Sequence, residues 1–161
     1  MDIGKNTIGL AGWLVVTFAA AWIGSRYIPG ARYASLDKPS WNPPNAVFGP
    51  IWSLLYVFMG IAAWFVWRKE GFSGIGLALV LFVMQLVLIV LWSYLFFGLH
   101  RPDVAFVDIV ALWTTILVVM ILFWRVDRVA GGLMVPYAVW VAFASYLNFV
   151  LCRLNRGLLP G

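Results

Sequence analysis

Five long apolar runs, separated by polar connections, dominate this chain of 161 residues. The runs cover roughly residues 7–24, 46–67, 75–98, 104–124 and 131–151. A helix needs about 20 residues to cross about 30 Å of hydrocarbon, and each run has about that length. Because backbone polar groups must be satisfied inside lipid, each run is predicted to be a spanning helix. The pattern predicts an all-α membrane protein, a five transmembrane helix bundle forming one domain over residues 1–161.

The first run has an alternative interpretation. Lys5 followed by an apolar stretch and the alanines at 19–21 resembles a signal peptide with a small-residue cleavage site. The run continues through Trp22 and Ile23, which makes it long enough to span. Cleavage would also leave the long first connection, residues 25–45, untethered, so we retain the run as a helix.

Composition and charge support a bilayer environment. Hydrophobic residues make up 64% of the chain and charged residues 11%, whereas soluble domains carry roughly 25% charged residues. With five spans, five lysines and arginines fall on one side and six on the other, so the positive-inside rule gives no orientation. The net charge of +5 is therefore spread over both faces and forms no patch for nucleic acid. We expect a multi-pass integral membrane protein whose surroundings are the lipid bilayer.

Side chains for familiar chemistry are scarce. His100 is the one histidine and Cys152 the one cysteine, so the spacing predicts no metal site and no intrachain disulfide. Asp108 is the one acidic or basic side chain inside the predicted spans, whereas coupled transporters usually carry several. Five spans also do not divide into two equal inverted repeats. The sequence thus argues against a coupled pump, and we expect Asp108 to face the bundle interior and hydrogen-bond to a neighbouring helix or the first loop.

Aromatic residues are abundant, with ten tryptophans, twelve phenylalanines and six tyrosines. An interfacial belt accounts for those near helix ends, and we assign to it Trp13, Trp64, Trp67 and Trp124. Other rings recur on single helical faces, which carry Trp52, Trp92 and Trp140. Such faces meet a neighbouring helix or a cavity. Large rings beside small residues suit a cavity better, because tight membrane seams favour small residues, but ordinary bundle core stays an alternative.

The first connection is rich in proline and aromatic residues, reading K-P-S-W-N-P-P at residues 38–44. Prolines fix φ and remove donors, so this loop has few accessible states and loses little entropy when a ligand arrives. Pro50, inside the second run, predicts a kink that opens space next to Trp52. We predict that residues 33–44 form a stiff lid over an intramembrane pocket lined by Trp52 and Trp140.

Three stretches carry a specific resemblance. Residues 34–60 read A-S-L-D-K-P-S-W-N-P-P-N-A-V-F-G-P-I-W-S-L-L-Y-V-F-M-G, which resembles the signature of the translocator protein family. Residues 85–98, Q-L-V-L-I-V-L-W-S-Y-L-F-F-G, are similar to the family's third helix. Residues 136–149, P-Y-A-V-W-V-A-F-A-S-Y-L-N-F, are similar to its fifth. Bacterial members are called tryptophan-rich sensory proteins, and the resemblance covers nearly the whole chain in order.

The resemblance implies a five-helix bundle, commonly a homodimer, whose first loop folds over a pocket. Members bind porphyrins such as protoporphyrin IX, many bind benzodiazepine-type ligands, and mitochondrial members bind cholesterol. We therefore expect a tetrapyrrole-binding sensory or regulatory protein that requires no cofactor. Because no histidine lies in the predicted spans, the usual axial ligand is missing, which favours a metal-free porphyrin over haem.

The resemblance also implies the pocket residues. Those of the first helix and loop are Trp22, Ser25, Tyr33, Trp41, Asn42 and Pro43. Those of the second helix are Phe48, Gly49, Ile51 and Trp52. Those of the fourth and fifth helices are Val104, Val107, Asp108, Ala111, Trp140, Phe143, Ala144 and Leu147. We add Trp92 from the third run. The tryptophans linked with porphyrin chemistry match Trp52 and Trp140, with Tyr33 nearby, which makes these three the candidate catalytic residues.

Departures from the family pattern limit the transfer. Ile89 replaces the usual asparagine, and Val104 replaces a tryptophan found in vertebrate members. Phe149 stands before Arg153 where the weak cholesterol motif needs a tyrosine, which disfavours cholesterol and favours a bacterial membrane. Three functions stay open: a tetrapyrrole sensor or regulator, a light-dependent porphyrin-degrading enzyme in which Trp52 and Trp140 carry electrons or radicals, and a transporter of porphyrins or small hydrophobic molecules.

Overall fold

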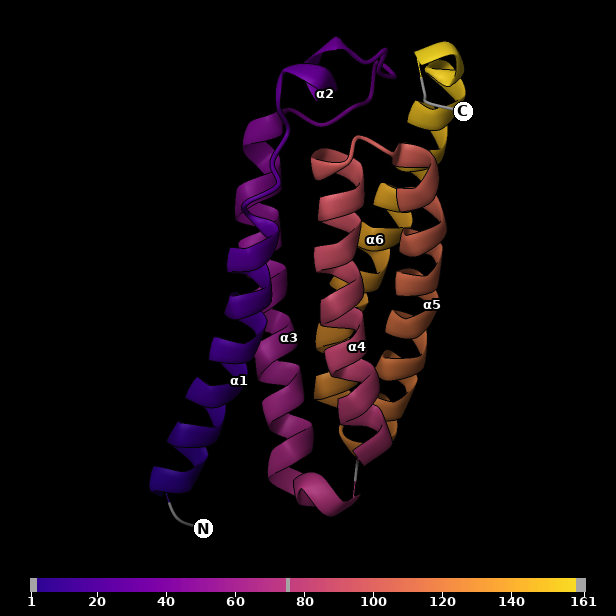
Figure 1. Cartoon of the computed structure of the whole chain (residues 1–161). Coiled ribbons are helices and arrows are strands. Elements are labelled where there is room, and N and C mark those ends of the chain that lie inside the picture. Colours follow the sequence, from indigo (N-terminus) through magenta and orange to yellow (C-terminus); the bar gives the residue numbers. More distant parts are fainter. Residues whose placement is uncertain (1–2, 75, 159–161) are drawn as a thin grey trace.

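The computed structural model describes residues 3–74 and 76–158, and within these ranges it contains helices and no strand (Figure 1). The elements in chain order are α1 (Ile3–Gly24), α2 (Ala31–Ser35), α3 (Asn45–Gly74), α4 (Gly76–Ser93), the π-helical turn η1 (Tyr94–Gly98), α5 (Pro102–Val126), α6 (Arg128–Leu154) and the 3-10 turn η2 (Arg156–Leu158). Within the described residues, five helices are long and apolar enough to cross a membrane. The predicted fold class is confirmed.

The helices extend past several predicted ends. α1 begins at Ile3, and α3 continues to Gly74 although the apolar run stops at Trp67. The helical backbone dihedrals of α3 break at Gly71, whose φ is 65°, and are kept at Pro50, so the predicted kink at Pro50 stays a prediction. Pro50 lies near the start of α3, so its missing N–H removes a single helical hydrogen bond. Ile75, the predicted start of the third run, lies outside the described residues.

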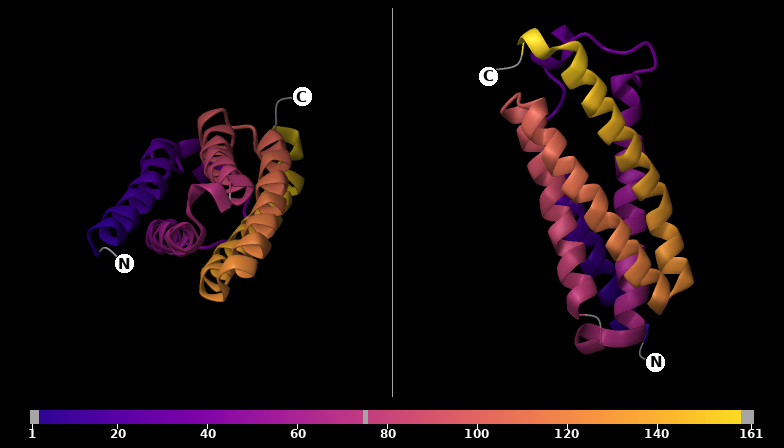
Figure 2. Two further views of the ribbon diagram at one scale, coloured as in Figure 1. Left: turned by 90° about the horizontal axis from the view of Figure 1, so that it is seen from below. Right: turned by 90° about the vertical axis from the view of Figure 1, so that its right-hand side faces the viewer.

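The long helices form one bundle with α1 at its side (Figures 1 and 2). α1 packs on α3 and α4, α5 packs on α4 and α6, and α6 closes the bundle against α3. The first connection, with α2, covers the end at which α6 terminates (Figure 1). This arrangement places the predicted lid over one end of the bundle and leaves much of the apolar surface of α1 facing outward.

Two hydrophobic clusters fill the interior. The larger runs along α3 to α6, where the largest fully buried side chains include Tyr137, Phe82 and Phe123. A smaller cluster lies beneath the first connection and consists of Tyr33, Phe96, Ala105, Leu147 and Leu151. The outward rings and aliphatic chains of α1 match a lipid-facing helix, because hydrocarbon solvates apolar side chains as well as a protein core does.

α1 approaches α3 closely at Gly60. Gly60 is buried in α3, and a Cβ placed there would lie 2.8 Å from Cδ2 of Leu14, 3.1 Å from Oγ1 of Thr17 and 3.3 Å from Cα of Leu14. Thr17 itself is fully buried and donates its hydroxyl to the carbonyl oxygen of Leu14, 3.1 Å away. Small residues at such crossings let two membrane helices approach.

Candidate functional site

An apolar cavity of about 290 Å³ lies among α1, α3, α4 and α6, near the covered end of the bundle. We call it the aromatic cavity. The predicted ligand-binding residues that line it are Ser25, Phe48, Gly49, Trp52, Trp92, Trp140 and Ala144. Tyr27, Ile28 and Pro29 also line it and were not predicted from the sequence, and Tyr56 lines it from the helical face that it shares with Trp52. Ile89 also lines the cavity, so the departure from the family's asparagine is a change in the cavity wall.

Trp52 and Trp140 enter this cavity from different helices. The Trp52 ring lies 5.9 Å from Tyr56 and 6.1 Å from Tyr137, measured between ring centroids. The Trp140 ring lies 6.0 Å from that of Phe48, and its indole Nε1 is buried without a hydrogen-bond partner in the described part of the chain. Each tryptophan is thus held by neighbouring rings, at distances typical of favourable aromatic pairs.

Asn148, which the sequence analysis did not single out, positions the third tryptophan. Its Oδ1 accepts a hydrogen bond of 3.1 Å from Nε1 of Trp92, and its Nδ2 donates to the carbonyl oxygen of Pro102 over 2.8 Å. Asn148 is almost fully buried. It therefore joins α4, α5 and α6 beside the cavity. A lone amide inside an apolar run was the available signal, because buried polar groups in membranes need partners.

The first connection is tied to the end of α6. Asn155 donates from Nδ2 to the carbonyl oxygen of Asp37 over 2.9 Å and accepts at Oδ1 from the Asp37 N–H, also over 2.9 Å. Trp41 stacks on Tyr146 with ring centroids 5.5 Å apart and planes 10° apart. Residues 33–44 consequently sit over α6, while the loop residues that line the aromatic cavity come from 25–29.

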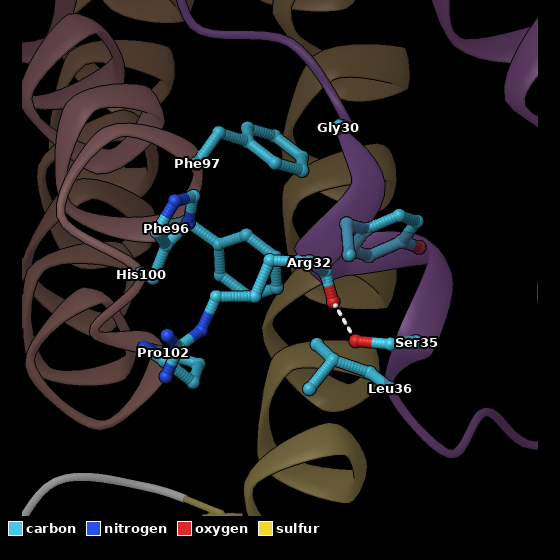
Figure 3. Close-up of a pocket in the computed structure, with 9 residues that line it drawn as sticks. Gly30, Arg32, Ser35, Leu36, Phe96, Phe97, His100 and Pro102 are labelled. Atoms are coloured by element: carbon cyan, nitrogen blue, oxygen red, sulfur yellow. Dashed lines mark hydrogen bonds between the residues drawn. The ribbon is translucent and has the colours of Figure 1, made fainter.

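Tyr33 lies in a second cavity, of about 300 Å³, which we call the polar cavity (Figure 3). Its lining consists of Gly30, Arg32, Tyr33, Ser35, Leu36, Phe96, Phe97, His100 and Pro102. The Tyr33 hydroxyl donates to Oδ1 of Asn42 over 3.1 Å. Burial raises the pKa of Tyr33 above its ordinary value of 10.0, and the hydrogen bond with Asn42 offsets part of that rise. Tyr33 is therefore a neutral hydrogen-bonding group at physiological pH.

The remaining predicted residues line neither cavity. They are Trp22, Trp41, Asn42, Pro43, Ile51, Val104, Val107, Asp108, Ala111, Phe143 and Leu147. Of the α5 positions among them, Val104, Val107 and Ala111 turn outward, and Val107 is 69% exposed, whereas Asp108 is buried. Trp22 is 62% exposed, with the Arg26 guanidinium 4.2 Å from its ring centroid. For the α5 positions the reason is the packing order, because α1, α3, α4 and α6 line the aromatic cavity and α5 does not.

Asp108 is buried, as predicted from its position inside the fourth run. The expected hydrogen bond to a neighbouring helix or to the loop is not formed, because the buried Oδ2 has no partner among residues 3–74 and 76–158. Its place on α5 also keeps it out of both cavities.

Comparison with known proteins identifies the family. A sequence model of the TspO/MBR family matches residues 10–154. The chain belongs to the TspO/MBR family. It is 41% identical over 160 residues to the tryptophan-rich protein TspO of Chlorobaculum tepidum, covering 95% of this chain and 99% of that protein. It is also 40% identical over 152 residues to protein CrtK of Rhodobacter capsulatus, covering 92% and 93%.

More distant members are equally well covered. The translocator protein of Homo sapiens is 34% identical over 151 residues, which is 91% of this chain and 89% of that protein. Membership in the TspO/MBR family and the five spanning helices together make the chain a multi-pass integral membrane protein. The resemblance inferred from the proline-rich loop and the third and fifth runs is thereby confirmed.

Proposed function

We propose that this TspO/MBR protein is a sensory or regulatory membrane protein whose aromatic cavity binds a tetrapyrrole such as protoporphyrin IX. The observation that carries the proposal is the convergence of Trp52, Trp92 and Trp140, from three helices, on one apolar cavity. A flat macrocycle needs flat partners, and each aromatic ring can bury roughly 150–250 Å². A relative in Cereibacter sphaeroides, 38% identical over 143 residues, is named a tryptophan-rich sensory protein, which agrees with this role.

The cavity's size and chemistry refine the ligand class. Its 290 Å³ lies at the lower end of the roughly 300–1,000 Å³ of drug-sized sites, so a benzodiazepine-type ligand fits within it and a macrocycle extends beyond it. His100 lines the polar cavity and not the aromatic one. A porphyrin held between the tryptophans thus meets no imidazole, and a metal-free ring is preferred over haem.

A second candidate function is light-dependent degradation of the bound porphyrin. Trp52 lies within ring-contact distance of Tyr56 and Tyr137, so a redox-active indole has phenol side chains beside it. In this function Trp52 and Trp140 would carry electrons or radicals during a photo-oxidation of the porphyrin in which dissolved dioxygen is the oxidant.

The test is porphyrin binding in the dark by Trp52→Ala and Trp140→Ala in one detergent. Each truncation is expected to weaken protoporphyrin IX binding by roughly 5–150-fold, on the order of 1–3 kcal/mol, if stacking resembles that of bases on aromatic side chains. Trp64→Ala is the control, because Trp64 donates to the carbonyl oxygen of Asn6 near the uncovered end of the bundle. Quenching of tryptophan fluorescence reports binding, and circular dichroism checks folding.

Illumination of the same samples separates the two candidates. Loss of the porphyrin spectrum under light that is abolished in Trp52→Phe would support the enzyme, whereas binding without spectral loss supports the sensor. Wild-type affinity in both Trp52→Ala and Trp140→Ala, with weakened binding in Trp64→Ala, would place the site elsewhere.

A further inference from the structure

The polar cavity differs from the aromatic cavity in its charge. It contains the cationic side chain of Arg32 and the imidazole of His100, and none of its lining residues is acidic. Figure 3 shows Arg32 extending from α2 towards Pro102 at the start of α5, with His100 on the same side. Asp103 follows Pro102 directly but is held by Arg101 at 2.7 Å, so it does not neutralise Arg32.

Both basic side chains are free for a ligand. Within the described residues, the Arg32 guanidinium forms no ion pair and no hydrogen bond with another side chain. The Ser35 hydroxyl donates to the backbone carbonyl oxygen of Arg32 and leaves the guanidinium untouched. His100 has a φ of 56°, the left-handed region that non-glycine residues seldom occupy. Such strained positions are concentrated at functional sites. The cavity is therefore positive, partly enclosed and without an internal counterion.

Phe97 separates the two cavities and lines both. Its ring lies 5.7 Å from Trp92, which faces the aromatic cavity, and 5.6 Å from Tyr33, which faces the polar one. Phe97 is carried by the π-helical turn η1, a type of irregularity frequent at functional sites. A ligand too large for the aromatic cavity can thus extend past the Phe97 ring into the polar cavity.

We propose that the polar cavity is a subsite for the acidic groups of a ligand whose flat apolar body occupies the aromatic cavity. This inference rests on the proposed function and names its ligand class: an aromatic macrocycle that bears carboxylates on flexible arms. Arg32 offers the planar donor fork that matches a carboxylate, and His100 offers an N–H in either charge state. Lys38, 4.9 Å from the Tyr33 ring centroid, adds positive charge nearby.

The test compares protoporphyrin IX with its dimethyl ester, which has the same ring and no ionised carboxylate. Arg32→Gln is expected to weaken binding of the acid about 3- to 10-fold and of the ester less than about twofold, as for one partly exposed charged contact. His100→Gly, which tolerates the positive φ, is expected to act in the same direction. Arg26→Gln is the matched control, because Arg26 lies over Trp22, outside both cavities, and it should change neither affinity.

The outcomes separate this inference from the proposed function. If Arg32→Gln weakens acid and ester equally, or neither, the acidic subsite is overturned. In that case, if Trp52→Ala still binds the dimethyl ester more weakly than wild type does, the proposed binding of the porphyrin ring in the aromatic cavity remains supported. If wild-type protein binds neither porphyrin, the proposed function fails and the subsite fails with it.

Discussion

At the scale of single residues, Asn148 is the polar group on which the shape of the aromatic cavity depends. It accepts from the Trp92 indole and donates to the Pro102 carbonyl from a position that is 1% exposed. Asn148→Ala would leave the partly buried Trp92 N–H without its acceptor and the Pro102 carbonyl oxygen without this donor. We expect this change to lower the free energy of unfolding by about 1–3 kcal/mol, the usual effect of one unsatisfied buried group.

Thermal unfolding in detergent would measure the loss, with Thr114→Ala as the control. Thr114 is exposed and bonds only to the Val110 carbonyl of its own helix, over 2.9 Å, so its removal should matter little. Equal melting temperatures for Asn148→Ala and the control would contradict the bridging role of Asn148.

Residue patterns predicted part of the site. Trp52, Trp92 and Trp140 were identified from their helical faces, and they do line one cavity. The outward direction of Val104 and Val107 could not be predicted in this way. Periodicity tells which residues share a face, but a spanning helix is apolar on every face, so hydrophobicity does not tell which face turns inward. The polar partner of Trp92 was likewise hidden, because Asn148 comes from a helix far away in sequence.

At the scale of helices, the crossing of α1 and α3 depends on Gly60. A side chain there would overlap Leu14, including its backbone Cα, so Gly60→Val is expected to push α1 away from α3. Overpacking of this kind destabilises by about 1–3 kcal/mol. Gly12→Val, in α1, is the matched control, because a Cβ at Gly12 meets nothing within 4 Å.

Melting temperatures of the two variants in the same detergent would check this prediction, since both replace glycine by valine in a helix and so change helix propensity in the same way. If Gly12→Val is as destabilising as Gly60→Val, the close crossing of α1 and α3 does not explain the effect.

Helix ends were less predictable than helix existence. The second run stops at Trp67 because Arg68, Lys69 and Glu70 follow, yet α3 continues through these three residues as far as its break at Gly71. These charged residues have high helix propensity, so the helix persists after the chain ceases to be apolar. Hydropathy predicts where the lipid ends, whereas the backbone hydrogen bonds end at a position set by local propensity.

At the scale of the whole molecule, Asp127 joins three long helices at the uncovered end. It lies between α5 and α6, its Oδ2 is 2.7 Å from Nζ of Lys69 in α3, and its Oδ1 accepts from the N–H groups of Val129 and Ala130. The hydrogen bond with Lys69 is the main reason that the pKa of Asp127 lies below its ordinary value of 3.8. Its stabilising effect is present when the unfolded carboxylate is ionised and is lost as pH falls through the lowered pKa.

We therefore expect the melting temperature to fall as the pH drops from about 5 to about 3, with a shallower fall in Asp127→Asn. Asparagine keeps an acceptor for the first turn of α6 but has no charge for Lys69. Asp37→Asn is the control, because Asp37 contacts Asn155 through its backbone alone and should retain the wild-type slope. A wild-type slope in Asp127→Asn would show that other carboxylates cause the acid sensitivity.

The pair of hydrogen bonds between Asp37 and Asn155 has a topological consequence. It closes the chain between these two residues into a ring that contains α3, α4, α5 and α6. α1 remains outside the ring, attached to it through residues 25–36 and packed mainly on α3 and, to a lesser extent, on α4. The aromatic cavity lies between α1 and the helices of the ring. A displacement of α1 towards lipid would therefore widen the cavity without breaking a contact between two helices of the ring.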